Sequence, residues 1–249
     1  MSKISIDINC DMGEGLSTDE SVMPYITSAN VACGAHAGDY NTMDATVKLA
    51  KKYGVAVGAH PGYPDREGFG RRELDLSPTE IYRLVVYQIG GLAALCRVNG
   101  LEMKHVKPHG ALYNLAAKDE EVAESIVKAV YDVNPGLILF GLSGGLLIST
   151  GRQMGLQTAS EVFADRTYQS NGSLTPRTES AALIVNTDQA VKQVKTLLEE
   201  GYIEAVNGRR VMTEANTVCI HGDSKGAEEF ARKLSEGLNE AGVDITALN

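Results

Sequence analysis

Apolar runs typical of buried β-strands alternate with helical patterns along almost the whole chain. Seven strand-like runs are expected, at residues 4–8, 28–33, 55–59, 103–107, 137–141, 158–163 and 217–221. Parallel strands are joined only through crossover connections, so this alternation predicts a parallel sheet of the α/β class. Seven strands favour a (β/α) barrel, although periodicity alone leaves an open doubly wound sheet as the alternative. The 249 residues suit one such barrel, so a single domain is expected over residues 1–249.

The helices between these strands have readable ends. N-caps are expected at Ser77, Thr187 and Ser224, and the three helices should end at Gly100, Gly201 and Gly242. Ser77 and Glu80 have the spacing of a capping box, with Pro78 at the first helical position. Asn207-Gly208 predicts a type I′ turn in a small hairpin over residues 203–212. Two long polar segments, 61–76 and 166–180, are expected to be binding loops or lids.

Charge and composition restrict the partners of the chain. A net charge of −9 argues against a nucleic-acid-binding protein, which needs a basic face. The N-terminus turns acidic before an apolar stretch forms, so no signal peptide is expected, and no apolar run approaches the length of a membrane span. The four cysteines lack CxxC spacing and are expected to be reduced, which suggests a cytoplasmic protein.

Polar and ionisable side chains lie within or directly after most of the expected strands. They are Asp7, Asn9, Asp11 and Glu14; Asn30 and His36; His60; Lys107 and His109; Glu161, Asp165 and Arg166; and His221. Four of the five histidines take equivalent positions in this series. Ligands bind at the carboxyl ends of parallel strands, so the convergence predicts an active site there.

Individual residues in this series allow different interpretations. His60 and His109 each stand beside a proline that stiffens the corner and fixes the direction of the ring, which favours function. Lys107 at a strand end must pair with a carboxylate or lose its proton if it is buried. Asp7 alternates with apolar neighbours, so it is either catalytic or a polar residue of the barrel interior. His105 lies within a strand and is expected to be structural.

Three kinds of site compete for these residues. Asp11, His36, His60 and His109 offer oxygen and imidazole ligands to a metal, but no HExxH or HxH spacing supports a tight site. Residues 141–145 match the GxSxG nucleophile elbow, and an aspartate and a histidine follow in the order of a serine hydrolase. No GxxxxGK[ST] loop is present, so a nucleotide would have to be bound by other means.

Six segments together resemble the LamB/YcsF family. They are DINCDMGEG (7–15), SANVACGAHAGD (28–39), GAHPGYPDREGFGRR (58–72), KPHGALYN (107–114), SEVFADRTY (160–168) and IHGDS (220–224). The resemblance implies a seven-stranded (β/α) barrel similar to that of polysaccharide deacetylases. It further implies ATP-dependent opening of the lactam of 5-oxo-L-proline to L-glutamate, with Mg²⁺ accompanying ATP. In this family the chain would be the A component of a 5-oxoprolinase complex, working with subunits B and C.

This activity assigns roles to the polar residues. Proton transfer is expected from Asp7 or Asp11 together with His60 or His109, and Lys107 is expected to stabilise developing negative charge. Substrate contacts are expected from Asn9, Asn30, His36, Glu161, Arg166, Arg177 and His221. Among them Arg166 or Arg177 would bind the substrate carboxylate. The alternatives are a metal-dependent amidase or deacetylase on the same barrel, with Asp11, His36 and His60 as ligands, and a non-catalytic protein that only binds the substrate for its partners.

Overall fold

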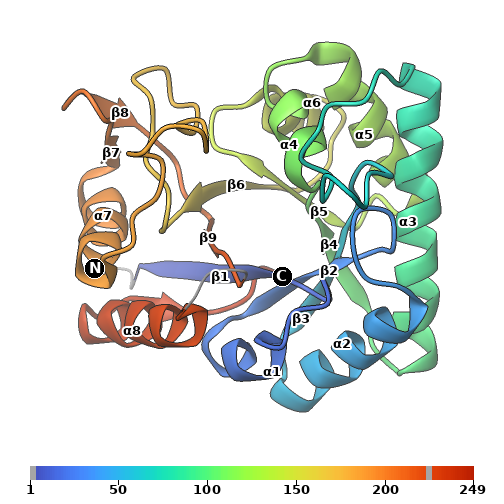
Figure 1. The fold of residues 1–249 in the computed structure, drawn as a ribbon, viewed down its shortest axis with the longest axis horizontal. Coiled ribbons are helices and arrows are strands. Elements are labelled where there is room, and N and C mark those ends of the chain that lie inside the picture. Colours follow the sequence, from blue (N-terminus) through green and yellow to red (C-terminus); the bar gives the residue numbers. More distant parts are fainter. Residues whose placement is uncertain (1–3, 223–225) are drawn as a thin grey trace.

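Seven parallel strands close into a barrel in the computed structural model, which describes residues 4–222 and 226–249 (Figure 1). The barrel strands are β1 (Ser5–Met12), β2 (Ser28–Ala32), β3 (Ala56–His60), β4 (Met103–Val106), β5 (Ile138–Leu142), β6 (Thr158–Phe163) and β9 (Thr217–Ile220). Each pairs with the next in this order, and β9 pairs with β1 to close the ring. The predicted seven-stranded barrel is therefore confirmed, and the open sheet is excluded.

Helices surround the barrel in the positions that the alternation predicts. They are α1 (Asp19–Val22), α2 (Tyr40–Tyr53), α3 (Pro78–Val98), α4 (Gly110–Ala116), α5 (Glu120–Val133), α6 (Leu146–Gln153), α7 (Thr187–Glu200) and α8 (Ala227–Glu240), with a 3₁₀ turn η1 (Met23–Tyr25). The capping box of α3 is confirmed, because Ser77 and Glu80 each accept a hydrogen bond from the other's backbone N–H. For α7 the prediction is wrong by one residue, since Asn186 is the N-cap. Ser224 lies outside the described residues.

The first strand is longer than its apolar run suggests. The expected strand at 4–8 continues to Met12, and a short strand β10 (Asp244–Ile245) pairs with its beginning. The extension carries Asn9 and Asp11, whose polar side chains obscured the strand pattern. Both alternate with the outward-facing Cys10, so β1 directs a row of polar side chains into the barrel.

The apolar core lies mainly between the barrel and its helices. Outward-facing strand residues such as Ile8, Val31 and Val57 are completely or almost completely buried there. The inside of the barrel is largely polar near the carboxyl ends of the strands, whereas Phe140 belongs to a smaller apolar cluster and stacks on His105. This division leaves the barrel interior available for a hydrogen-bonded polar network.

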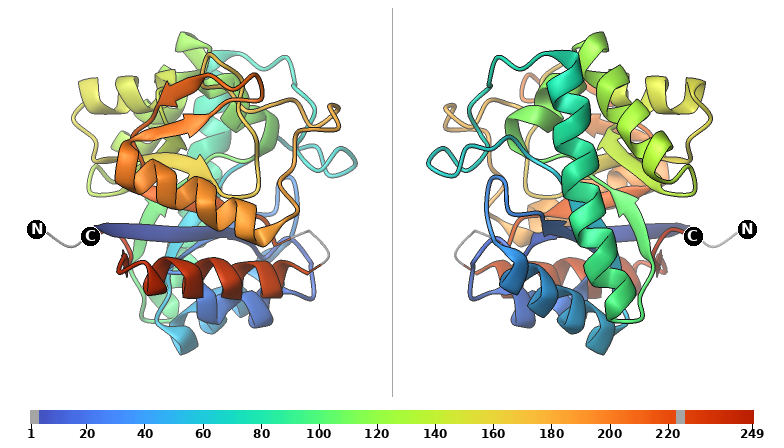
Figure 2. Two further views of the ribbon diagram at one scale, coloured as in Figure 1. Left: turned by 90° about the vertical axis from the view of Figure 1, so that its left-hand side faces the viewer. Right: turned by 90° about the vertical axis from the view of Figure 1, so that its right-hand side faces the viewer.

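Helix α3 is the one helix of the described residues that is long and apolar enough to span a membrane by length and composition. Figure 2 shows it running along the outside of the barrel. One side of it is buried, including Ile81, Val85, Ile89 and Leu92. This packing explains much of its apolar composition.

The expected hairpin is present between α7 and β9, but its turn differs from the prediction. Strands β7 (Tyr202–Glu204) and β8 (Arg210–Met212) pair antiparallel. Ala205 and Arg209 are joined by a backbone hydrogen bond of 2.8 Å, and the Gly208 N–H donates to the Ala205 carbonyl. Gly208 has a φ of 78°, whereas Asn207 does not have the positive φ that a type I′ turn requires. The loop therefore has three residues, 206–208, instead of two, and among them Gly208 has the positive φ.

Candidate active site

A cleft of about 780 Å³ opens at the carboxyl ends of the barrel strands. The predicted site residues that line it are Asp11, His60, Lys107, His109, Arg166, Arg177 and His221. Parts of both long loops also line the cleft, among them Arg71 from the first loop and residues 171–177 from the second. The position agrees with the expectation for a parallel barrel.

Lys107 forms the floor of this cleft. Its Nζ atom lies 2.8 Å from Glu161 Oε1, 3.0 Å from Asp11 Oδ1 and 3.1 Å from Asn9 Oδ1. Burial lowers the pKa of Lys107, but the nearby carboxylates outweigh burial and hold that pKa well above its ordinary value. The side chain therefore remains a cation beneath the cleft, as its predicted pairing with carboxylates requires.

Asp7 lies deeper in the barrel and does not line the cleft. Its Oδ1 accepts hydrogen bonds from Thr27 at 2.6 Å and Ser28 at 2.7 Å, and its Oδ2 accepts one from Thr217. Burial raises the pKa of Asp7, and the hydroxyl groups partly oppose that rise. This geometry favours the structural interpretation of Asp7 over the catalytic one.

Asn9 and Asn30 connect the deep layer to the floor of the cleft. Asn30 Nδ2 donates to Asn9 Oδ1 at 2.8 Å and to Asp11 Oδ1 at 2.9 Å. Asn9 Nδ2 donates to Glu161 Oε1 at 2.9 Å. The side-chain oxygen of Asn30, Oδ1, lies 2.8 Å from His105 Nε2. Asn9, Asn30 and Glu161 were predicted to contact the substrate. The structure places them beneath the cleft, where they orient Asp11 and Lys107.

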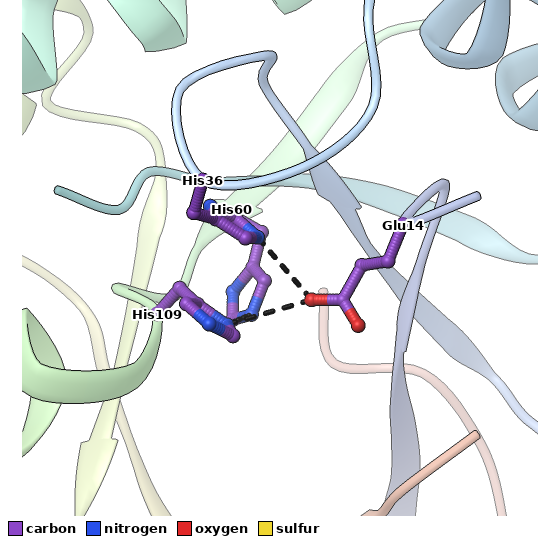
Figure 3. Close-up of side chains that lie close together, drawn as sticks. All are labelled: Glu14, His36, His60 and His109. Carbon is purple, nitrogen blue, oxygen red and sulfur yellow. Dashed lines mark hydrogen bonds and ion pairs between the residues drawn. The ribbon is translucent and has the colours of Figure 1, made fainter. Parts of the chain in front are cut away.

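Three histidines and one glutamate form what we call the histidine cluster: Glu14, His36, His60 and His109 (Figure 3). His36 and His109 are stacked with ring centroids 3.8 Å apart, and His60 meets both rings edge-on. Glu14 Oε1 lies 3.2 Å from His36 Nε2 and 3.5 Å from His109 Nδ1. The carboxyl ends of β1, β2, β3 and β4 thus bring one polar side chain each to the same place.

The ionisable side chains at this end of the barrel differ in their protonation. Burial lowers the pKa of His36 to about 3 and that of His109 to about 2, so both rings are neutral near pH 7. For Asp11, burial raises the pKa, but His60 and Lys107 together lower it well below its ordinary value. Asp11, which lies 3.3 Å from His60 Nε2, is therefore an ionised carboxylate at the edge of the cleft.

The loop at 61–76 holds the histidine cluster through its backbone. Phe69 has a φ of 54°, the only positive value at a residue other than glycine in the described chain. Its carbonyl accepts a hydrogen bond from His109 Nε2 at 2.8 Å. A Cβ atom on the next residue, Gly70, would lie 2.8 Å from His36 Cβ and 2.9 Å from His109 Cδ2. Only glycine permits this close approach.

The two predicted carboxylate-binding arginines differ in their surroundings. Arg166 is buried and donates to the Thr175 carbonyl at 2.6 Å and to the Ala182 carbonyl at 3.3 Å, so it anchors the loop at 166–180. Arg177 is exposed, and its Nη2 atom lies 3.0 Å from His221 Nε2. Arg177 therefore presents its guanidinium at the surface of the cleft, whereas the hydrogen bonds of Arg166 hold the loop in place.

The serine-hydrolase arrangement is incomplete. Ser143 does lie between a strand and a helix, β5 and α6, and it lines the cleft. His221, however, contacts Asp165 at 2.6 Å through Nδ1 and Arg177 through Nε2. The nitrogen that would accept the serine proton is thus engaged by Arg177, and the described side chains give Ser143 no base.

Sequence reasoning placed Glu14 near the site without giving it a role, and it did not select Arg71 or Tyr113. Glu14 follows the polar strand β1 and Arg71 belongs to the GFGRR segment, so both had a signal in their motifs. Tyr113 lies within the apolar pattern of α4, which concealed it. It lines the cleft, and burial together with the charge of Glu161 raises the pKa of its hydroxyl well above the ordinary value.

Comparison with known proteins agrees with the sequence motifs. The model of the LamB/YcsF family matches residues 6–249. A relative from Geobacillus thermodenitrificans (strain NG80-2), named as the A subunit of 5-oxoprolinase, is 55% identical over 98% of this chain and 97% of its own. A relative of the same name from Bacillus subtilis (strain 168) is 53% identical, again over 98% of this chain and 97% of its own.

Solved structures confirm the barrel. The lactam utilization protein from Thermus thermophilus has a TM-score of 0.93 and 42% identity, covering 98% of this chain and all of its own. A family 4 carbohydrate esterase from Streptomyces lividans has a TM-score of 0.50 at 12% identity over 98% of this chain and 93% of its own. This likeness is one of fold alone and confirms the predicted deacetylase-type barrel. The chain belongs to the LamB/YcsF family, as its sequence motifs indicated.

Proposed function

We propose that this chain is the A subunit of an ATP-dependent 5-oxoprolinase, which opens the lactam of 5-oxo-L-proline to L-glutamate while ATP is hydrolysed to ADP and phosphate. The names of the relatives support the substrate class, since they describe a 5-oxoprolinase and a lactam utilization protein. The same names describe one lettered component of a larger enzyme, which supports partners that we propose to be subunits B and C.

One observation supports a catalytic rather than a purely binding role: the buried cation of Lys107 at the floor of an ionisable cleft. A lactam is an amide with a weakly electrophilic carbonyl, so its opening develops negative charge on the carbonyl oxygen. A fixed ammonium group in a site with little water stabilises such charge strongly. A pocket that only bound the substrate would not need Lys107, Asp11 and the histidines together.

The chemistry of the cleft fits anionic ligands. Arg71 and Arg177 line it above Lys107, and its volume is within the range of pockets for small molecules. Arg177 would pair with the substrate carboxylate, while Arg71 would face the phosphate oxygens of ATP, which is expected to bind as its Mg²⁺ complex. ATP supplies the driving force by activating the lactam carbonyl, in this chain or elsewhere in the complex.

Asp11 is the side chain best suited to accept a proton from the attacking water. It is ionised, it lines the cleft, and Asn30 and Lys107 fix one of its oxygens. Its second oxygen lies 3.3 Å from His60 Nε2, and this contact helps to keep the carboxylate ionised. Asp7 lies beneath the cleft and takes no part in this scheme.

The test is glutamate formation from 5-oxoproline and ATP. This chain alone, subunits B and C alone, and the three together are compared, with Lys107→Met as the inactive control. We expect activity only in the complete mixture, and its loss with the variant. Full activity of subunits B and C without this chain would contradict the proposal.

A second candidate, a metal-dependent amidase, is favoured by the histidine cluster alone. It would open the amide without ATP and would be inhibited by a chelator. Glutamate formation by this chain in the presence of a metal, with ATP omitted, would favour it over the first proposal.

A further inference from the structure

Two imidazole nitrogens in the histidine cluster face each other as acceptors. His60 Nδ1 lies 2.7 Å from the Lys107 carbonyl oxygen, and His109 Nε2 lies 2.8 Å from the Phe69 carbonyl oxygen. A carbonyl oxygen only accepts, so both of these nitrogens carry hydrogen. In neutral rings the remaining nitrogens, His60 Nε2 and His109 Nδ1, hold lone pairs, yet they are only 2.9 Å apart. Either a proton on one of the rings or a metal ion must therefore lie between them.

A third acceptor joins this pair. Glu14 Oε1 lies 3.5 Å from His109 Nδ1 and 3.2 Å from His36 Nε2. One ligand atom from each of the four residues lies within 4.8 Å of the other three. A single proton between His60 and His109 would relieve only their own contact. A metal ion would accept all four groups at once.

The hydrogen bonds around the facing nitrogens also fit a metal site. Histidine ligands of metals commonly donate their other N–H to a backbone carbonyl, which fixes the tautomer. His60 and His109 both show this arrangement. The Nδ1 atom of His36 is buried and has no partner among the described residues, so the hydrogen of that ring can lie on Nδ1 and leave Nε2 to bind the ion.

We propose that Glu14, His36, His60 and His109 bind one divalent transition-metal ion, with zinc as the preferred ion. Three imidazoles and one carboxylate match the ligands that zinc takes, whereas Mg²⁺ and Ca²⁺ prefer oxygen. Two nitrogens bound to one tetrahedral zinc at about 2.0–2.1 Å are roughly 3.3 Å apart. The facing nitrogens of His60 and His109 would therefore separate by only a few tenths of an ångström. The ring of His36, which is now stacked on His109, would have to rotate to direct its Nε2 atom at the same ion.

This inference does not depend on the proposed 5-oxoprolinase activity, because metal binding needs neither substrates nor partner proteins. The full-length chain is treated with chelator, dialysed and titrated with ZnCl₂ near neutral pH in a calorimeter. Co²⁺ is titrated in parallel, since its visible spectrum reports tetrahedral coordination by nitrogen and oxygen. We expect one ion per chain, with micromolar affinity or better.

The variants Glu14→Gln and His109→Gln should each weaken zinc binding by about 10-fold or more, as loss of a ligand removes one coordinate bond. Glu240→Gln is the matched control, since it removes an exposed carboxylate of α8 outside the cluster and should leave the affinity unchanged. His221→Gln tests the second group of possible ligands, Asp11, Cys219 and His221, and a loss of affinity in this variant alone would overturn the proposal. Thermal unfolding of every variant confirms that it is folded. If one variant unfolds, the other carries the test.

Two other results would overturn the proposal. One is a folded chain that binds neither Zn²⁺ nor Co²⁺ at concentrations far above micromolar, or binds them equally well in both cluster variants. The other is an imidazolium signal from His60 or His109 in ¹⁵N spectra at neutral pH that persists unchanged when zinc is added. In that case a shared proton bridges the rings. Inactivity of the three-component mixture, by contrast, would sink the proposed function and leave the metal site standing.

Discussion

The ammonium group of Lys107 and the carboxylate of Glu161 are paired at 2.8 Å inside the barrel, where both side chains are almost completely buried. Such a pair depends on both partners, because removing one leaves the other charge buried and uncompensated. Glu161 lies within strand β6 and is not part of the lining of the cleft. Its task is to keep Lys107 charged.

We therefore expect Lys107→Met to lower the free energy of unfolding by about 3–5 kcal/mol and turnover by about 10²-fold or more. The double variant Lys107→Met with Glu161→Gln should recover part of the lost stability, because Glu161 is then neutral and Asp11 keeps its contacts with Asn30 and His60. It should not recover activity. Urea unfolding and glutamate formation in the three-component mixture measure the two effects. A double variant that regains turnover would show that Lys107 has no catalytic role.

Asp7 and Asp11 both point into the barrel from strand β1, yet their surroundings predict opposite results. Asp11→Asn should lower turnover by about 10²-fold or more, since the amide cannot accept a proton. Asp7→Asn should reduce stability instead and leave kcat of the remaining folded protein nearly unchanged. Steady-state kinetics at equal concentrations of folded protein distinguish them. A similar loss of kcat in both variants would restore Asp7 as a catalytic candidate.

The raised pKa of Asp7 also predicts a pH dependence. Between the ordinary aspartate pKa, about 3.9, and the higher pKa in the native state, the native protein binds more protons than the unfolded chain. The stability contributed by Asp7 therefore falls as pH rises through this window, and Asp7→Asn lacks this dependence. Urea unfolding of both proteins from about pH 4 to about pH 7 should show the difference in stability, wild type minus variant, decreasing with pH. A constant or rising difference would contradict the assignment.

The sequence predicted the barrel because its strands and helices have clear patterns. Outward-facing strand residues such as Ile8 and Val31 are apolar, and capping residues such as Ser77 mark helix starts by local hydrogen bonds. The end of β1 was missed since the inward Asn9 and Asp11 look like a loop when their partners are unknown. Those partners, among them Asn30, are brought close only by closure of the barrel.

The location of the candidate site was predictable from the sequence. Which of its residues face the cleft and which lie beneath it was not. Strand ends placed Asp11, Lys107 and His109 together, since all parallel strands open at the same side. Which polar residue faces the cleft and which lies beneath it depends on the depth of each strand in the barrel. Asp7 and Asn9 differ from Asp11 in this depth, which a single sequence does not reveal.

Ser143 provides a test of the nucleophile-elbow motif. Since Arg177 engages the histidine nitrogen that a serine nucleophile would need, Ser143→Ala should leave kcat within about twofold of the wild type. Ser149→Ala on α6 is a matched control outside the cleft. Turnover of both variants is measured in the three-component mixture. A fall of about 10²-fold in Ser143→Ala alone would show that the motif acts as a nucleophile after all.

A variant of Arg177 tests which arginine of the cleft binds the substrate carboxylate. Its guanidinium lies at the mouth of the cleft beside His221 and is expected to bind the carboxylate of 5-oxoproline. Arg177→Ala should raise KM for 5-oxoproline by about 10-fold or more and change kcat little, because the contact is the same in the ground state and the transition state. Arg210→Ala, an exposed arginine beside Tyr202, is the control and should change neither parameter. An unchanged KM with a strongly reduced kcat would instead assign Arg177 to charge that develops during the reaction, and the substrate carboxylate would then have to be bound by Arg71.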